Sequence, residues 1–449
     1  MTSSLSTETG TRPSRSARRP PAPRVGMRRL LVASLCGLAS CSGAASGPSV
    51  RPSTAGAVEA YHARDAVRVE RETRDAQDPT ALALRAWALA TVGRGPEARE
   101  AEDAALADPA LADSLAAGLL ADRVDRLARD GAYADAARAA RSALADPRVR
   151  ADSARRVSVE NDGRLWAALD RVPPTTAQGA GESPVHLDAV GLRRTAVRVG
   201  PAPPGDYVLD TGANLSTLAA SEAARLGLVV RAVGVNVGGV TGARVPAGLA
   251  VADAVVIAGV RVGPVPFLVL PDSALAFPQI GYAIEGIVGL PVLAALAPIE
   301  LPLADGTLRV GVSPRAGVAL AFDGLDPVVR VPVRVADGVR DTVACYLDTG
   351  TSGTDFHASF YVRHRSALDA LGHPADTGVG GAGGARTISA LEVDSLRLEW
   401  PDHPALLHDV PVYLDPGDGA ADCRLGLDAF AGARALYFDV ERFVLAPVW

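Results

Sequence analysis

The tripeptide Asp-Thr-Gly occurs twice in this sequence of 449 residues, at residues 210–212 and 348–350. Both copies follow a short, largely apolar segment, and a Gly-rich stretch lies downstream of each. A further glycine motif follows at Gly289 and Gly426, which lie 79 and 78 residues beyond the respective aspartates. The same order and spacing in two copies indicates an internal duplication, which is far more specific than either tripeptide alone.

Two carboxylates brought together at buried strand ends would give this chain acid–base chemistry. Like charges a few ångströms apart repel in a low dielectric, so such a pair holds one proton and titrates as a unit. The ionised member can take a proton from water while the protonated member polarises a carbonyl group. Threonine hydroxyls can brace the loops, and glycine lets backbone amides approach the carboxylates. A Gly-rich hairpin beside the pair can close over an extended peptide as a flap.

These motifs resemble those of the aspartic proteases, particularly the retropepsin-like group found in bacteria. Leu218 and residues 226–228 (Leu-Gly-Leu) extend the first signature. The resemblance covers about residues 186–449 and implies an aspartic endopeptidase acting on a peptide or protein substrate, with no cofactor and no metal. It implies the following site within one chain: catalytic Asp210 and Asp348; dyad-supporting Thr211, Gly212, Thr349 and Gly350; and flap residues Gly238, Gly239, Gly380 and Gly381.

The sequence departs from the family pattern in two respects. Leu290 and Pro291 follow the first motif glycine where the family often has an acidic or amide residue, although Asp428 fits that place in the second copy. No counterpart of a flap tyrosine is evident. Two alternatives stay open. The first is a β-scaffold that no longer cleaves and instead binds peptides or protein partners, and the second is dimerisation that assembles two sites, although we expect a monomer.

The residues around the motifs predict β structure, because apolar side chains alternate with others, as at Val331, Val333 and Val335. The expected fold class is α + β multidomain. An N-terminal α-helical, repeat-like domain precedes a bilobal all-β aspartic protease domain, whose two retropepsin-like lobes span residues 186–322 and 323–449. The active cleft is expected between these lobes.

Residues 57–170 predict a helical domain, because they are rich in Ala, Leu, Arg and acidic residues with apolar positions at helical spacing. Residues 95–109 and 131–147 resemble each other, and each ends in Asp-Pro. The successive Asp-Pro spacings of 30 and 38 residues bracket the tetratricopeptide period. The region therefore resembles a short tetratricopeptide array, either a scaffold for a protein partner or a helical spacer. Residues 171–185 predict a linker.

Residues 1–40 are typical of an export signal, with basic residues, a short apolar run and then small residues. The apolar run is too short to span a bilayer as a permanent helix. Its end resembles the bacterial lipoprotein box, which implies that Cys41 is lipidated, with Met27 as an alternative start. The competing interpretation is an ordinary cleaved signal. Both predict export, and the first predicts a lipid anchor to a membrane in the periplasm or at the cell surface. Residues 41–56 predict a flexible tether.

The composition excludes several functions. All 45 basic residues are arginine, so the chain has no lysine for a phosphate-binding Walker loop or a Schiff base. The formal net charge is -6, and no long basic run follows the N-terminus. These two properties argue against nucleic-acid binding.

Three weaker patterns in the sequence also have plainer explanations. Residues 378–383 match a dinucleotide fingerprint literally, but the strand expected after them favours a flap. His403 and His408 lack further ligands at metal-binding spacing, which favours surface-loop histidines. Cys345 and Cys423 would form a disulfide if their strands are neighbours in an exported protein, and two buried free thiols stay equally open.

Overall fold

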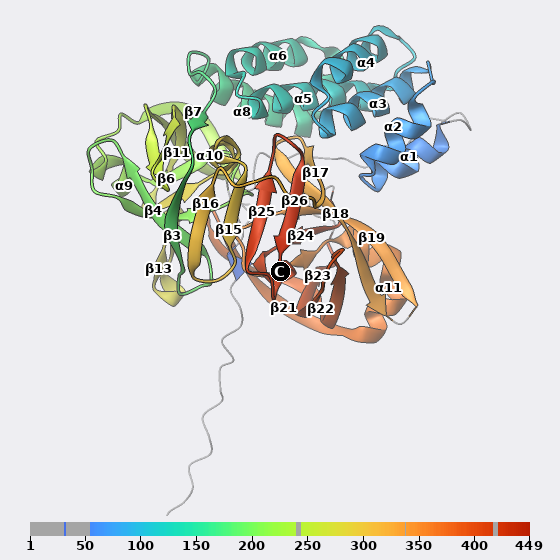
Figure 1. Cartoon of the computed structure of the whole chain (residues 1–449). Helices are drawn as coiled ribbons and strands as arrows, with labels where there is room; N and C mark the ends of the chain where they lie inside the picture. Colours follow the sequence, from blue (N-terminus) through green and yellow to red (C-terminus); the bar gives the residue numbers. More distant parts are fainter. Residues whose placement is uncertain (1–30, 33–53, 239–243, 337, 416–420) are drawn as a thin grey trace, which may run out of the picture.

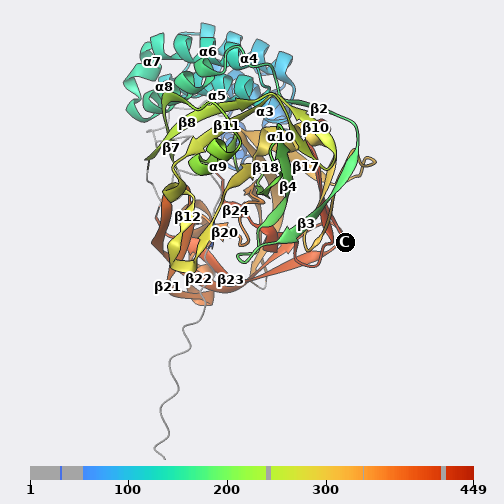
Figure 2. The same cartoon turned by 90° about the vertical axis from the view of Figure 1, so that its left-hand side faces the viewer.

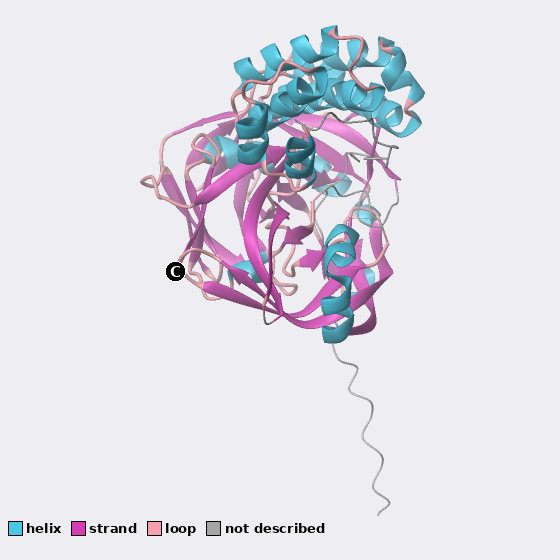
Figure 3. Ribbon diagram, turned by 90° about the vertical axis from the view of Figure 1, so that its right-hand side faces the viewer, coloured by secondary structure: helices cyan, strands magenta, loops and turns pink. Residues whose placement is uncertain are grey.

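The computed structural model describes residues 31–32, 54–238, 244–336, 338–415 and 421–449. Helices form the first part of the chain and cover one side of a large β region (Figures 1 and 3). The predicted order, a helical region followed by a β-rich region, is therefore confirmed. The helices are α1 (Ala55–His62), α2 (Ala66–Thr73), α3 (Pro79–Thr91), α4 (Gly95–Ala107), α5 (Asp113–Arg129), α6 (Tyr133–Ala145), α7 (Pro147–Ala151) and α8 (Ser153–Ala168).

Aspartate and proline set several of the helix boundaries. Asp78 caps α3 by accepting a hydrogen bond from the Ala81 amide at 3.0 Å, and Pro79 occupies the first turn. Helices α4 and α6 end at Ala107 and Ala145, directly before the Asp-Pro dipeptides of the two similar segments. Successive helices then pack against each other, with α3 on α4 and α5 on α6. Within the described residues, no helix is both long and apolar enough to cross a membrane.

The first half of the β region contains the first Asp-Thr-Gly loop. Residues 171–185, expected as a linker, contain β2 and the start of β3, because these strands pair with β10 and β16. Helices α9 (Ala220–Arg225) and α10 (Leu290–Leu296) interrupt the strands. The strands are β2 (Thr176–Gln178), β3 (Gly181–Leu187), β4 (Arg193–Val199), β5 (Gly205–Leu209), β6 (Ser216–Ala219), β7 (Arg231–Gly238), β8 (Arg244–Ala252), β9 (Val255–Ile257), β10 (Val260–Gly263), β11 (Val265–Leu270), β12 (Ala276–Phe277), β13 (Tyr282–Ala283), β14 (Gly286–Val288), β15 (Ile299–Pro302) and β16 (Gly306–Val310).

The second half contains the second loop and the helical segment α11 (Ala358–Leu371), which is kinked at His364. A short strand from the start of the chain, β1 (Leu31–Val32), pairs with β21. The strands are β17 (Val318–Asp323), β18 (Asp326–Ala336), β19 (Val339–Leu347), β20 (Asp355–Phe356), β21 (Gly372–Gly381), β22 (Gly384–Glu399), β23 (Pro404–Tyr413), β24 (Cys423–Leu425), β25 (Ala435–Asp439) and β26 (Val444–Val448).

The two halves repeat one pattern of strand pairing. In the first half, β5 pairs with β4 and, in parallel, with β14, which also pairs with β6. In the second half, β19 pairs with β18 and, in parallel, with β24, which also pairs with β20. Each half then adds a hairpin, β7–β8 or β21–β22. The duplication seen in the sequence is thus a duplication of topology, and it places both Asp-Thr-Gly loops after equivalent strands.

A shared sheet joins the halves. Strand β15 of the first half pairs with β25 of the second, and the sheet continues through β16 and β3 on one side and through β26 and β17 on the other. Beneath it, one continuous apolar core contains buried residues of both halves, such as Leu209, Val288, Leu347 and Leu425. This common core holds the two halves in a fixed relation.

The helical region lies across one side of the β region (Figure 2). Ion pairs and a group of carboxylates lie at this junction. Arg64 contacts Asp323 at 3.2 Å, and Arg330 contacts Asp65 at 2.6 Å. Four further aspartates lie at this junction, and burial raises the pKa of each. The pKa is about 7 for Asp122, Asp162 and Asp326, and well above its usual range for Asp125.

The pH dependence of stability tests this carboxyl cluster. Asp326 holds its proton to about pH 7 in the folded chain, whereas an exposed aspartate loses it near pH ~4. The folded state therefore binds more protons in this window, and stability is lost as the pH rises from about 4 to about 7. We expect Asp326→Asn to remove about 1–3 kcal/mol of this loss in denaturant titrations at about pH 5 and about pH 8. The exposed Asp402→Asn should leave the loss unchanged, and equal behaviour of both variants would contradict the assignment.

Candidate active site

Each Asp-Thr-Gly loop begins where a buried strand ends. Asp210 follows β5 and Asp348 follows β19, and their side chains are only 2% and 1% exposed. The backbone extends the parallel ladder by one residue, since Asp210 N donates to Val288 O and Asp348 N donates to Leu425 O, both at 3.0 Å. The strand pairing therefore fixes the backbone of both aspartates before any side chain contributes.

The two threonines tie the loops together through crossed hydrogen bonds. Thr211 N donates to Thr349 Oγ1 and Thr349 N donates to Thr211 Oγ1, each at 3.0 Å. Each hydroxyl in turn donates to a carbonyl of the other half: Thr211 Oγ1 to Leu347 O at 2.8 Å and Thr349 Oγ1 to Leu209 O at 2.9 Å. All four bonds are buried, so the loops of the two halves are held in a symmetric and rigid arrangement.

The loop glycines bring the carboxylates together. Gly212 N donates to Asp210 Oδ1 at 2.8 Å, and Gly350 N donates to Asp348 Oδ1 at 2.9 Å. A Cβ atom on Gly350 would lie 2.4 Å from Asp210 Cγ, a distance that no side chain tolerates. The carboxylate of Asp210 therefore packs directly against the glycine whose amide binds Asp348, and both carboxylates lie beside Gly350.

This arrangement has a defined chemical capacity. Two carboxylates with almost no solvent exposure cannot both ionise cheaply when they lie beside each other, so a pair of this kind would hold one proton between them. One member of such a pair could then serve as a base and the other as an acid towards the same bound molecule. The backbone amides fix one oxygen of each carboxylate, and the second oxygen of Asp348 lies 3.9 Å from Arg424 Nε.

Gly289 and Gly426, the glycines of the later motifs, pack closely against the chain that follows each Asp-Thr-Gly. A Cβ on Gly289 would lie 2.7 Å from Ala213 O, and a Cβ on Gly426 would lie 2.4 Å from Gly353 O. In the second half, Asp428 accepts a hydrogen bond from Thr354 Oγ1 at 2.6 Å. In the first half, the corresponding residues Leu290 and Pro291 instead begin α10. The departure from the family pattern therefore falls on a helix start, where proline is favoured.

The predicted flap glycines lie at hairpin ends. Gly238 ends β7, Gly380 and Gly381 end β21, and Gly239 lies outside the described residues, as does Cys41. The turn of the second hairpin reaches the first half, where Gly383 N donates to Ala274 O at 3.1 Å. Residues 378–383 thus run from one strand into a tight turn, with no helix after them to hold a dinucleotide.

The two histidines that were weaker candidates for metal ligands make contacts within the fold. His403 Nδ1 contacts Pro404 O at 3.0 Å and its ring packs on Trp449, while His408 pairs with Ser395 across β22 and β23. Across the described part of the chain, no group of three or more His, Cys, Asp or Glu side chains could hold a metal ion.

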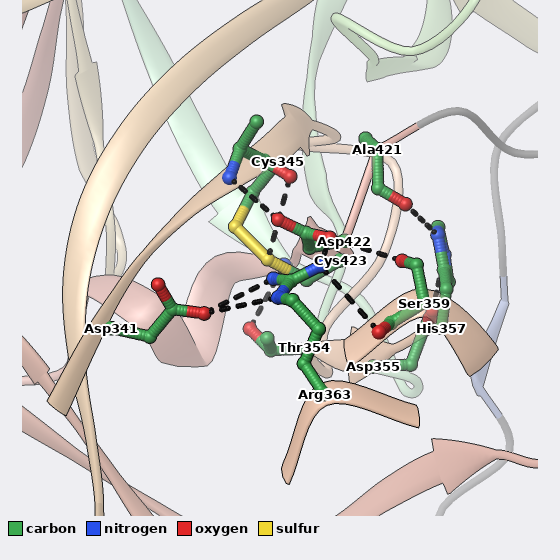
Figure 4. Close-up of a disulfide and its surroundings, with 12 residues drawn as sticks. Asp341, Cys345, Thr354, Asp355, His357, Ser359, Arg363, Ala421, Asp422 and Cys423 are labelled. Atoms are coloured by element: carbon green, nitrogen blue, oxygen red, sulfur yellow. Dashed lines mark hydrogen bonds and ion pairs between the residues drawn. A yellow bond between two sulfur atoms is a disulfide. The ribbon is translucent and has the colours of Figure 1, made fainter. Parts of the chain in front are cut away.

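Cys345 and Cys423 form a disulfide between β19 and β24, directly behind the second loop (Figure 4). Next to it, Asp422 Oδ1 accepts hydrogen bonds from Ser359 Oγ at 3.0 Å and Arg363 Nη1 at 2.7 Å. The bond and this network fasten β24 to the strand that carries Asp348 and to α11.

Two charged residues beside the dyad were missed from the sequence. Arg424 Nε lies 3.9 Å from Asp348 Oδ2, and the guanidinium is bound by Asp355. An alignment of the two copies could have found them. Arg424 stands two residues before its motif glycine, where the first copy has Ile287. Asp355 stands seven residues after Asp348, where the first copy has Thr217.

Comparison with known proteins agrees with this geometry. Residues 195–292 match the family model described as aspartyl protease, so the chain contains an aspartyl protease domain over these residues. The match includes Asp210 and Gly289 and ends before Asp348. The role of the second loop therefore rests on the duplication within this chain. No curated protein matches this sequence.

Removing one threonine hydroxyl should weaken the junction between the halves. Thr349→Val preserves the volume but leaves Thr211 N and Leu209 O buried without their partner. Each unsatisfied group costs about 1–3 kcal/mol, so we expect the free energy of unfolding to fall by about 2–6 kcal/mol in a denaturant titration. Thr349→Ser keeps the hydroxyl and should retain most of the stability. Equal losses in the two variants would contradict the role of the hydroxyl.

Peptide mapping tests the disulfide. In protein isolated without reductant, Cys345 and Cys423 should appear in one linked fragment and should be alkylated only after reduction. Because the bond closes a span of 78 residues, replacing both cysteines by alanine should lower the free energy of unfolding by about 4 kcal/mol. Alkylation of both thiols in the native, unreduced protein would contradict the bond.

Proposed function

We propose that this chain is an aspartic endopeptidase in which Asp210 and Asp348 form a catalytic dyad within one polypeptide. The observation that carries the proposal is the crossed threonine network, which holds two buried carboxylates beside Gly350. Loops held this way need no second copy of the chain. The proposal therefore favours a monomer with one site over a dimer with two.

The proposed reaction is hydrolysis of a peptide bond by water, without a covalent intermediate. The ionised carboxylate takes a proton from a water molecule bound between the aspartates, while the protonated carboxyl donates to the scissile carbonyl. The same pair then returns a proton to the leaving amine. The amides of Gly212 and Gly350 keep both carboxylates in place throughout, so little reorganisation is needed.

The hairpins β7–β8 and β21–β22 are proposed as flaps, with Gly238, Gly239, Gly380 and Gly381 towards the substrate. The turn of the second hairpin already contacts the first half through Gly383, which supports a position across the two halves. Such hairpins would exclude water from a bound peptide.

We further propose that the chain is exported and anchored by a lipid on Cys41. The sequence of the first 41 residues carries this proposal, and the Cys345–Cys423 disulfide supports it, because such bonds persist in oxidising compartments outside the cytoplasm. A membrane anchor would place the protease next to proteins of the cell envelope.

The helical region is proposed as a tetratricopeptide-like module that either presents a protein partner or spaces the β region from the membrane. It is tied to the first flap, since Asn236 N of β7 donates to Asn161 Oδ1 of α8 at 2.9 Å. Together with both halves of the β region, it also lines a cavity of about 320 Å³, where Tyr133 and Trp166 face Asn214 and Leu215 of the first half and Phe322 and Phe443 of the second. The hydrogen bond and the cavity both favour a role for the helical region close to the substrate.

Substitution of the dyad tests the proposed activity. Asp210→Asn and Asp348→Asn should each lower the rate of cleavage of a peptide library by about 10²- to 10⁴-fold, because each removes one partner of the acid–base pair. Cleavage products are identified by mass spectrometry at several pH values. The exposed Asp402→Asn serves as the control and should cleave as the wild type does. Unchanged cleavage by both dyad variants would reject the proposal and favour a peptide-binding scaffold.

A further inference from the structure

Because the chain carries the same topology twice, each position around Asp348 can be compared with the equivalent position around Asp210. Arg424 lies opposite Tyr346 in the register of β19 and β24, and Ile287 lies opposite Val208 in the equivalent register of β5 and β14. The neighbouring residues Leu347 and Leu425 face the core, as do Leu209 and Val288. Because side chains alternate along a strand, Arg424 and Ile287 occupy the same opposite face of their respective halves.

In the first half this face is apolar. Ile287 and Val208 are buried, and they belong to one apolar cluster with Val237 and Val245 of the first hairpin. A bound side chain at this position would meet aliphatic groups.

In the second half the same face is polar. Arg424 Nε and Nη2 donate to Asp355 Oδ2 at 3.0 and 2.5 Å, and both side chains are buried. Asp355 Oδ1 lies 3.3 Å from His357 Nε2, a contact that is an ion pair only when the histidine is protonated, and it accepts no other side-chain or backbone group within the described residues. The buried hydroxyl of Tyr413 likewise has no hydrogen-bond partner in the described part of the chain, and its ring stacks on His357. Burial and the nearby Asp355 raise the pKa of this phenol, so the hydroxyl keeps its proton.

Stability alone does not account for these charges. A buried ion pair gives little or no net stabilisation relative to apolar residues of similar size. The first half has isoleucine and threonine at the positions of Arg424 and Asp355, so the topology does not require charges there. Arg424 Nε also lies 3.9 Å from Asp348 Oδ2, so the charged pair adjoins the proposed dyad.

We propose that Arg424, Asp355 and Tyr413 form a polar specificity subsite that selects a carboxamide side chain, asparagine or glutamine, on one side of the scissile bond. The proposal rests on the proposed function in that the ligand is a peptide bound at the dyad. A carboxamide offers an N–H donor for Asp355 Oδ1 and a carbonyl acceptor for the Tyr413 hydroxyl. An aliphatic side chain would cover Asp355 Oδ1 and the Tyr413 hydroxyl without forming a hydrogen bond to either. The apolar position in the first half would bind an aliphatic side chain instead.

Binding of peptide isosteres tests this subsite independently of cleavage. The ligands are octapeptides of alanine and valine with a hydroxyethylene group in place of the central peptide bond, which aligns them on the carboxylates. The two residues flanking this group are Leu/Leu, Leu/Gln, Gln/Leu or Gln/Gln, and affinities for the full wild-type chain are measured by titration calorimetry. One of the two mixed ligands should bind about 5- to 150-fold more tightly than the Leu/Leu ligand, as expected for two buried groups gaining partners.

Two variants assign the preference to these residues. The double variant Arg424→Ile, Asp355→Thr copies the first half and should bind the Leu/Leu ligand best. Tyr413→Phe removes only a hydroxyl without a partner, so it should fold normally and lose several-fold in affinity for the preferred mixed ligand alone. The control Tyr361→Phe removes a hydroxyl bound to Asp369 on α11 and should change nothing.

The outcomes separate the subsite from the activity. Tightest binding of the Leu/Leu ligand by the wild type, binding of none of the ligands, or a preference unchanged in both variants would overturn the subsite. A wild-type chain that binds the mixed ligand as expected but cleaves no peptide would instead reject the proposed protease activity and leave the subsite in place.

Discussion

The site depends on one interaction, the exchange of hydrogen bonds between Thr211 and Thr349. Each hydroxyl accepts from the other loop's amide and donates to a carbonyl of the other half, so neither loop can shift without breaking two buried bonds. The shared core and the β15–β25 pairing bring the halves together, and this exchange joins the two loops directly. The relative position of the two Asp-Thr-Gly loops therefore depends on these hydrogen bonds.

Much of this arrangement could be predicted from the sequence because the chain carries it twice. The repeated Asp-Thr-Gly, with a glycine 79 or 78 residues later, predicts two equivalent loops, and alternating valines predict the strands around them. The alanine-rich segments ending in Asp-Pro predict helices whose ends agree with those of α4 and α6. Local periodicity and turn chemistry were sufficient for these features.

Other features depend on contacts between residues far apart in the sequence. Arg424 and Asp355 are separated by 69 residues and look like ordinary surface charges until β20 and β24 are paired. The short strand β2 lies in a segment rich in Pro and Gly and forms only because β10 offers a partner. The raised pKa values of the aspartates between α5, α8 and β18 likewise arise from docking of the helices, which no local pattern encodes.

The presence of Ile287 and Arg424 at equivalent positions has a consequence for symmetry. A homodimer built from one copy would present identical residues on both sides of its two-fold axis. A peptide could then bind in either direction with the same contacts. A chain that contains both copies is free of that constraint. Its two faces differ, so a peptide and the same peptide reversed meet different surfaces, and the polarity of the bound backbone becomes something the protein can recognise.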